Sequence, residues 1–431
     1  MKKIFIGMLC VLCVFAPNVS AEPFNEAQFE ALRVEVRHLT GVVLDLKQTV
    51  QSQRVEIDQL KSVRQTGPIE APPIAASVSG SRTLQGRWNP DIGAVADIVY
   101  KGDSPKADEE GADRISAREL ELVLGSPVDP YSRLDATLAF SDFEEASLEE
   151  AYYTHFDLFG WGITGRLGRF KPAVGKAASV HRDSLDTVDE PLVTQHYFGA
   201  EGFNKSGADI SRDIELPWDV THRLTLGVLE GGNGEEGTLF GETRRRPTLY
   251  TQLKNYIDLN DLTGLELGFT DLVGSRDEDT GFEVNVLGLD ATLIHRYGDQ
   301  RHVKLQSEAF RVSRRESFYI LENPDTGEIT EQDLDDARNL WGSYVLADWR
   351  FSPQWAAGLR FDEVQRVENG ENFADPDRTE RGYTGYLTFY QSEFARWRLQ
   401  FSHIDLTDGE DDNRVFVQGT FAIGEHKHKL S

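Results

Sequence analysis

The sequence predicts an all-β transmembrane antiparallel β-barrel of about sixteen strands, preceded by an N-terminal α-helical coiled coil. Three observations predict this fold. Segments of about ten residues alternate apolar and polar side chains from residue 91 to residue 423, and the connections between them alternate between short and long. An apolar repeat with alternating steps of three and four residues comes before these segments.

The composition of the 431-residue chain narrows the class of protein. A mean hydropathy of −0.43 with one long apolar run argues against a bundle of membrane-spanning helices. A formal net charge of −27 argues against binding to phosphate backbones, so no nucleic-acid partner is expected. With 39% hydrophobic and 10% aromatic residues, the chain is too apolar to be disordered as a whole.

Residues 1–21 have the pattern of a cleaved secretory signal. Lys2 and Lys3 precede the apolar run Ile4–Phe15, and Val19-Ser20-Ala21 offers small residues to a signal peptidase. The run is too short to span a membrane stably, although an uncleaved anchor is the alternative. Both cysteines of the chain lie inside this run, so the mature protein is expected to contain no thiol and no disulfide.

Residues 22–64 predict a periplasmic coiled coil. Nine apolar residues form a heptad seam, in which Gln53 is a polar member. The seam residues are Phe29, Leu32, Val36, Leu39, Val43, Leu46, Val50, Ile57 and Leu60. One such helix cannot bury its own seam, so it is expected to oligomerise, or alternatively to dock on the body of its own chain. Residues 65–87 are rich in Pro, Ala and Ser and predict a semi-rigid linker.

Residues 88–431 predict the barrel. In Arg396–Ser402, for example, one face carries Trp, Leu and Phe while the other carries Arg, Gln and Ser, so one face suits lipid and the other water. Sixteen candidate strands begin near residues 91, 115, 131, 147, 161, 208, 222, 248, 263, 285, 302, 342, 354, 381, 394 and 414.

The connections favour a barrel over a β-sandwich. Every second connection is a short turn, such as Asn260-Asp261 or Ser352-Pro353. The others are long and polar, notably 171–207, 230–247, 313–339 and 367–380. Outer-membrane barrels place short turns on the periplasmic side and long loops outside, whereas a sandwich has no reason to segregate them. Six of the seven tryptophans lie near the expected periplasmic rim, as an interfacial girdle requires. They are Trp88, Trp161, Trp218, Trp349, Trp355 and Trp397.

Several of these segments resemble one porin family. The run Gly165–Pro172, then Gly175 and His181, then Val188-Asp189-Glu190-Pro191-Leu192, resembles outer-membrane porins related to phosphate-selective porins O and P. The resemblance is closest to the branch labelled zinc-regulated outer-membrane proteins. It implies a sixteen-stranded, trimeric porin whose third loop folds into the pore. The last residues depart from the family, because His428–Ser431 replaces its usual terminal aromatic residue.

The loop 171–207 is the expected constriction of a water-filled pore for small charged solutes, because it follows the fifth strand and carries a mixed set of charges. The alternation also directs arginines into the lumen. The candidate pore-lining residues are Arg166, Arg169, Lys171, Lys176, His181, Arg182, Asp183, Arg360, Arg396 and Arg398. Alternatively, opposed charges in the lumen only brace the barrel, and the barrel is an anchor for a structural tether or envelope-interaction protein without significant transport.

No enzymatic or metal chemistry is expected from the sequence. It has no Gly-x-Ser-x-Gly elbow, no His-Glu-x-x-His motif and no phosphate-binding loop, so no catalytic residue is assigned. His181, Asp183 and His196 lack a tight metal-ligand spacing, so neither a metal nor a cofactor is predicted. The expected partners are outer-membrane lipid and lipopolysaccharide, further copies of the chain in a homotrimer, and the cell wall through the coiled coil.

Overall fold

The computed structural model describes residues 90–103, 114–141, 145–200, 202–216, 220–232, 239–240, 246–275, 284–322, 329–366, 379–406 and 411–424. The predicted signal, coiled coil and linker lie outside these residues. All described residues belong to one compact unit, residues 81–431. No helix among the described residues is long and apolar enough to cross a membrane.

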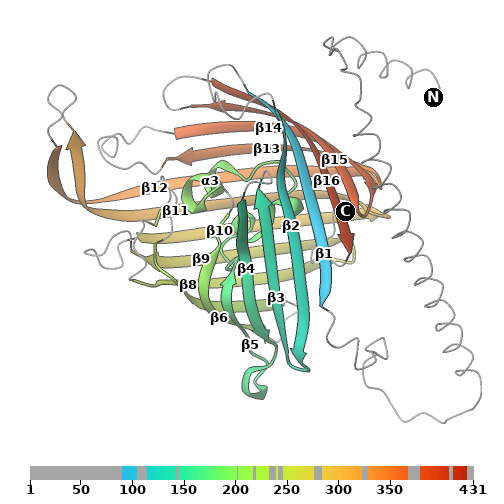
Figure 1. The fold of residues 1–431 in the computed structure, drawn as a ribbon, viewed down its shortest axis with the longest axis horizontal. Helices are drawn as coiled ribbons and strands as arrows, with labels where there is room; N and C mark the ends of the chain where they lie inside the picture. Colours follow the sequence, from blue (N-terminus) through green and yellow to red (C-terminus); the bar gives the residue numbers. More distant parts are fainter. Residues whose placement is uncertain are drawn as a thin grey trace, which may run out of the picture. The chain divides into compact units, whose positions relative to one another are not determined.

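Sixteen antiparallel strands form one closed barrel in which each strand pairs with its neighbours in sequence and β1 pairs with β16 (Figure 1). The strands are β1 (Asp91–Asp103), β2 (Arg114–Asp129), β3 (Ser132–Ser141), β4 (Glu145–His155), β5 (Thr164–Phe170), β6 (Lys205–Glu215), β7 (Val220–Leu229), β8 (Thr248–Asn260), β9 (Thr263–Gly274), β10 (Val284–Gly298), β11 (Arg301–Glu322), β12 (Ile329–Ser352), β13 (Trp355–Gln365), β14 (Thr379–Ser392), β15 (Ala395–Asp405) and β16 (Asp411–Gly424). The predicted strand number is confirmed, and most predicted strand starts lie within three residues of the observed ones.

One predicted loop is wrong. The segment 313–339 was expected to be a long polar loop, but β11 and β12 continue through most of it and pair with each other as far as Glu322 and Ile329. Beyond Arg314 and Gly342 these two strands have no other pairing partner among the described residues. Beyond the barrel wall a two-stranded ribbon is not bound to the apolar and polar alternation of a lipid-facing strand, and so the period-2 pattern did not reveal it.

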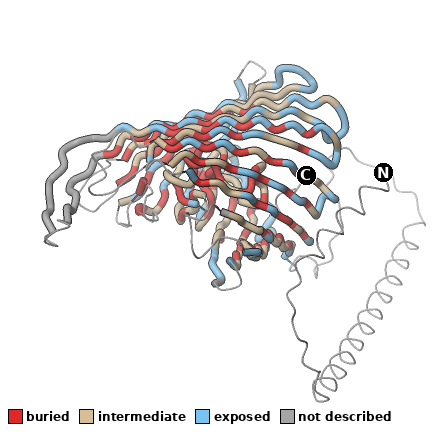
Figure 2. The backbone as a smooth tube through the Cα atoms, turned by 90° about the horizontal axis from the view of Figure 1, so that it is seen from above, coloured by how far each residue is buried: buried red, intermediate tan, exposed pale blue. Residues whose placement is uncertain are grey.

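Burial along the strands follows the predicted two-residue period (Figure 2). On β15, for example, Trp397, Leu399 and Phe401 are exposed on the outside, while Arg398 and Gln400 are buried on the inside. Four of the six tryptophans predicted for the rim are described, and all four are exposed and lie in a short connection or near the short-turn end of a strand. They are Trp161, Trp349, Trp355 and Trp397. The outer surface therefore carries the apolar residues and the inner surface most of the charges.

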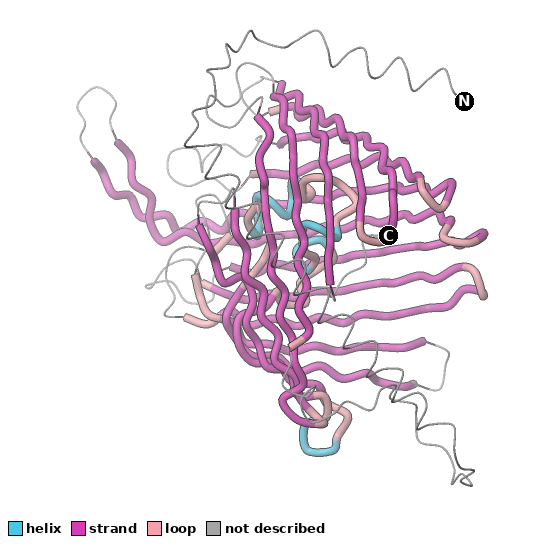
Figure 3. Tube along the Cα trace, turned by 45° about the vertical axis from the view of Figure 1, so that its right-hand side comes forward, coloured by secondary structure: helices cyan, strands magenta, loops and turns pink. Residues whose placement is uncertain are grey.

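The inside of the barrel is not uniformly polar. The connection from β5 to β6 contains two 3-10 turns, η3 (Ala177–Ser179) and η4 (Arg182–Ser184), and the helix α3 (Leu192–Phe198). Figure 3 shows these helical segments surrounded by strands, and α3 packs against β12 and β13. Its Val193, Tyr197 and Phe198 belong to one buried apolar cluster with inward side chains of the wall, among them Phe310 and Leu346. A hydrophobic core therefore occupies part of the barrel interior, where the alternation alone predicted water.

Candidate functional site

The connection between β5 and β6, residues 171–204, is called the inner loop below because it crosses the interior of the barrel. It was predicted as 171–207, but residues 205–207 belong to β6 and pair with residues 168–170 of β5. Its backbone contacts side chains of β9, β11, β13 and β15, which are distant in sequence. From Lys171 to Ala200, Ala200 is the single exposed residue. The inner loop is thus a packed internal element held by many contacts with the wall.

The first of these contacts involves Gly175–Ala177 and is called the carboxylate anchor. The backbone N–H groups of Lys176 and Ala177 donate to the two carboxylate oxygens of Glu308, at 2.7 and 3.2 Å, and the N–H of Gly175 donates to the Thr270 hydroxyl at 3.1 Å. Glu308 is 1% exposed. Gly175 has φ +57°, and a Cβ there would collide with Glu308. Only glycine fits this close approach without strain.

The second set of contacts involves residues 183–189 and is called the arginine wall. Its side chains come from β2, β13 and β15 and are Arg118, Arg360, Arg396 and Arg398. Each guanidinium donates to a backbone carbonyl of the inner loop. Arg118 donates to Val188 at 2.6 Å, Arg360 to Asp189 at 2.8 Å, Arg396 to Asp183 at 2.5 Å and Arg398 to Thr187 at 2.8 Å. The last three arginines are only 2–3% exposed, so their side chains are almost inaccessible to solvent.

Val188 is held through both polar groups of its peptide unit. Its N–H donates to the Gln400 side chain at 2.7 Å, and its carbonyl accepts from Arg118. The Val188 side chain is fully buried against Val99 and Phe416. Next to it, Asp189 accepts from Gln400 at 2.7 Å. These contacts hold this part of the inner loop against β15, β16 and β1.

A third group of contacts surrounds His181 and is strongly acidic. Nε2 of His181 lies 3.2 Å from Glu150, and Nδ1 lies 3.6 Å from Glu121 and 3.7 Å from Glu149. Burial would lower the pKa of His181, but Glu121 and Glu150 outweigh it and raise this pKa to about 10. In the absence of another cation, the ring is therefore an imidazolium at neutral pH.

The predicted site residues fall into several groups and do not form one charged ring. Lys176 belongs to the carboxylate anchor, Arg360, Arg396 and Arg398 belong to the arginine wall, and His181 and Lys171 lie in the acidic group. Arg182 bonds within the inner loop, to the carbonyl of Ala200 at 2.7 Å. Asp183 is buried, and its carbonyl contacts Arg396.

The two arginines of β5 lie apart from one another. Arg166 forms a two-point pair with Asp209, at 3.1 and 2.5 Å, and its guanidinium lies 4.3 Å from the Phe170 ring centroid. Arg169 lies 3.6 Å from Glu230 and donates to the carbonyl of Glu149. Arg169 of β5 thus contacts residues at the ends of β4 and β7, beside the inner loop.

Two functional residues were missed because β-bulges displace the alternation. A register shift on β2 lets Arg118 and its neighbour Glu119 both contact the interior. A second shift, on β4, lets Glu149 and Glu150 both face His181. A bulge re-aims one side chain of a strand, and no residue of these segments signals it in the sequence.

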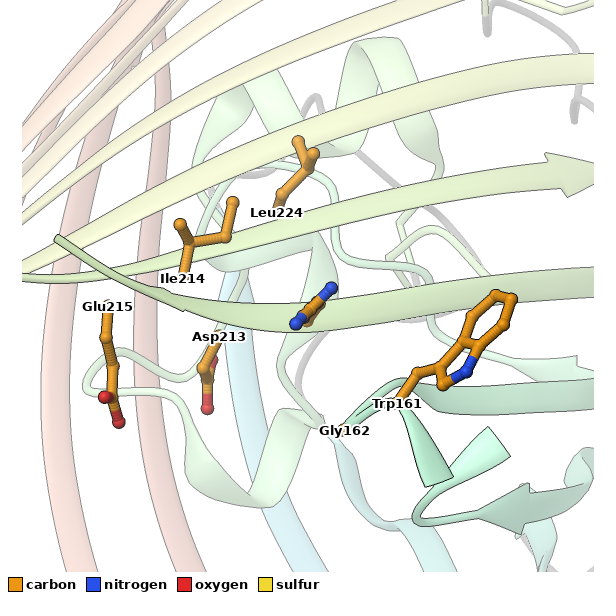
Figure 4. A pocket seen from close by; sticks show the side chains of 7 residues that line it. Trp161, Gly162, Asp213, Ile214, Glu215 and Leu224 are labelled. Atoms are coloured by element: carbon orange, nitrogen blue, oxygen red, sulfur yellow. The ribbon is translucent and has the colours of Figure 1, made fainter. Parts of the chain in front are cut away.

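A separate hollow of about 750 Å³ lies at the short-turn ends of β5, β6 and β7 (Figure 4). Trp161, Ile214 and Leu224 contribute apolar surface, and Asp213 and Glu215 contribute carboxylates. None of its lining residues belongs to the inner loop. The hollow is therefore independent of the contacts described above.

Comparison with known proteins places the fold among porins. No family model matches the chain. An uncharacterized protein of Aquifex aeolicus (strain VF5) is 28% identical over 332 residues, which cover 71% of this chain and 68% of that protein.

Three solved structures have a TM-score of 0.50 with this chain. The outer membrane channel DcaP of Acinetobacter baumannii is 13% identical, with 80% of this chain and 100% of that chain covered. The anion-selective porin from Comamonas acidovorans is 11% identical, with 78% and 99% covered. OprB of Pseudomonas putida is 10% identical, with 78% and 94% covered. The chain has a porin-like sixteen-stranded barrel.

Proposed function

We propose that the chain is a porin of the outer membrane of a Gram-negative bacterium, through which small charged solutes diffuse passively. The observation that carries this proposal is a closed sixteen-stranded barrel with an apolar outer surface and a loop that crosses its interior. Exposed apolar strand residues suit lipid, and a loop inside the lumen narrows the path and sets its charge. In this proposal outer-membrane lipid and lipopolysaccharide surround the barrel, and its relatives are the porins related to phosphate-selective porins O and P.

Planar-bilayer recording of the purified full chain tests the proposal. We expect stepwise conductance from the wild-type protein and a several-fold larger conductance when residues 177–194 are replaced by a short Gly-Ser linker. Reversal potentials in a salt gradient then give the ion selectivity. A conducting wild type whose conductance is unchanged by the replacement would contradict the role of the inner loop as the constriction.

A closed barrel that anchors a structural tether is the second candidate function. The dense packing favours it, because the arginines of β13 and β15 are buried and nearly every residue from Lys171 to Ala200 is covered. In that case the wild-type protein would be electrically silent, while the linker variant would conduct. This pair of results separates the two candidates.

We further propose that residues 22–64 form a periplasmic coiled coil that supports a homotrimer. Removal of residues 22–81 should lower the temperature at which the oligomer dissociates on a gel, because the contacts between the apolar seams of neighbouring chains are then lost. An oligomer of unchanged stability would instead favour attachment of the coiled coil to the cell wall.

A further inference from the structure

The acidic group around His181 gathers carboxylates and one imidazole in a buried place. Three glutamates lie within 3.7 Å of the ring nitrogens, namely Glu121 of β2 and Glu149 and Glu150 of β4. Apart from Glu149, which is half-buried, their side chains are almost inaccessible to solvent. Buried charges are stable only when they are paired or bound to a metal.

The distances on the Nδ1 side of His181 are compatible with the ligands of one metal ion. Nδ1 lies 3.6 Å from Oε1 of Glu121 and 3.7 Å from Oε2 of Glu149, and all three atoms lie within 4.8 Å of one another. Two ligands of a tetrahedral ion bound at about 2.0–2.1 Å lie roughly 3.4 Å apart. Small movements of two side chains would close the set around one ion.

The Nε2 side of the ring completes the pattern. Nε2 lies 3.2 Å from Oε2 of Glu150. A histidine that binds a metal through one nitrogen almost always donates its other N–H to a carboxylate or carbonyl, which fixes the ring and its tautomer. Glu149 occupies the ligand position because the bulge on β4 turns it inward beside Glu150. The backbone of β4 therefore supplies both a ligand and the group that orients the histidine.

We propose that His181, Glu121 and Glu149 bind one divalent transition-metal ion of the zinc type, which ties the inner loop to β2 and β4. Zinc accepts imidazole nitrogen and carboxylate oxygen, and a site with three protein ligands leaves a fourth position for water, whereas calcium and magnesium take oxygen ligands. The metal would replace the proton on Nδ1 and bind the two buried carboxylates. This inference is independent of whether the barrel conducts.

A second group with ligand-like composition, His403, Asp405 and Asp411, does not share this geometry. Both ring nitrogens of His403 already lie at hydrogen-bond distance from oxygens, 3.0 Å to Asp405 and 2.9 Å to Asn413. Its side chains are also more exposed than those around His181. His403 therefore serves as a control.

The test is zinc binding to the full-length protein in detergent after treatment with a chelator. We expect the wild type to bind about one zinc ion per chain. His181→Gln should lower the affinity for zinc at least 100-fold, and Glu150→Gln should lower it about 10–100-fold. Glu149→Gln keeps the shape of the side chain and should lose affinity like His181→Gln. The controls His196→Gln and His403→Gln should bind as the wild type does. Heat-modifiable migration on a gel verifies that each variant has a folded barrel.

A cobalt spectrum of the wild-type protein keeps the test independent of the variants. Tetrahedral coordination by one nitrogen and carboxylate oxygens gives intense visible absorption bands, which an excess of zinc should abolish while magnesium leaves them unchanged. Failure of the wild type to bind either metal, or equal zinc affinity in His181→Gln and wild type, would overturn the proposal. His181 would then be an imidazolium that serves only as an ion-pair partner.

Discussion

The carboxylate anchor and the arginine wall hold the same loop through opposite halves of the peptide group. At the carboxylate anchor, backbone N–H groups donate to one side chain, Glu308. At the arginine wall, backbone carbonyls accept from four side chains on three strands. At the carboxylate anchor one side chain accepts both of these hydrogen bonds, whereas at the arginine wall the hydrogen bonds are shared among four side chains. A single substitution should therefore be most damaging where one side chain satisfies several backbone groups.

Glu308→Ala tests this difference most strongly. It leaves two buried N–H groups of the inner loop without their acceptor, at a cost of about 1–3 kcal/mol each. We expect amide exchange at Lys176 and Ala177 to accelerate by at least tenfold and the loop to become sensitive to protease. Glu266→Gln is the matched control, since Glu266 pairs with the side chains of Lys176 and Lys254 and its substitution leaves the acceptor of the two N–H groups in place. Equal protection in Glu308→Ala and wild type would contradict the anchor.

Gly175→Ala tests the same anchor by crowding it. The added methyl group would collide with the Glu308 carboxylate and approach Phe310 to 2.8 Å at a position with φ +57°. Gly199→Ala is the control, because Gly199 also has a positive φ of +107° but no heavy atom closer than 3.6 Å to the added Cβ. Backbone strain accompanies both substitutions and is larger at Gly199, whose φ of 107° and ψ of 155° lie in a region that essentially only glycine adopts. A larger loss of amide protection in Gly175→Ala than in Gly199→Ala would isolate the collision, and a clearly smaller loss would contradict it.

Arg398→Met tests the arginine wall, where several side chains share the contacts with the inner loop. It removes one donor to the Thr187 carbonyl, but Arg360 still donates to the Thr187 hydroxyl and the Asp189 carbonyl. We expect a loss of about 1 kcal/mol, visible as a small rise in open-channel noise. The double variant with Arg360→Met should lose more than the sum of the two single variants, because both guanidinium donors to Thr187 are then gone. Simple additivity would show that the arginines act separately.

The alternation of outward and inward side chains along the strands could be predicted from the sequence, whereas the contacts inside the barrel could not. Exposed Trp397 and Leu399 alternate with buried Arg398 and Gln400, as predicted, because one face of each strand must avoid water. Arg118 and Glu149 escaped prediction because single-residue bulges reverse their facing. The identity of the anchors depends on contacts across more than 100 residues of sequence, such as Glu308 with Lys176. Alternation within one strand contains no information on such partners.

The smallest expected effect concerns the ion pair between Asp186 of the inner loop and Lys304 of β11. Burial would raise the pKa of Asp186, but the Lys304 ammonium outweighs it and holds this pKa below its usual range. A carboxylate with a lowered pKa stabilises the folded state above its ordinary pKa of about 3.9 and loses that contribution as the pH falls through the lowered value. The pair is partly solvated, so its contribution should be below about 1 kcal/mol.

Amide exchange of the inner loop should therefore be steady from pH 7 to about pH 5 and accelerate slightly below pH 4, after correction for intrinsic exchange. Asp186→Asn should show the faster exchange already at neutral pH and a flatter acid limb, whereas an acid limb identical to that of the wild type would assign the change to other carboxylates.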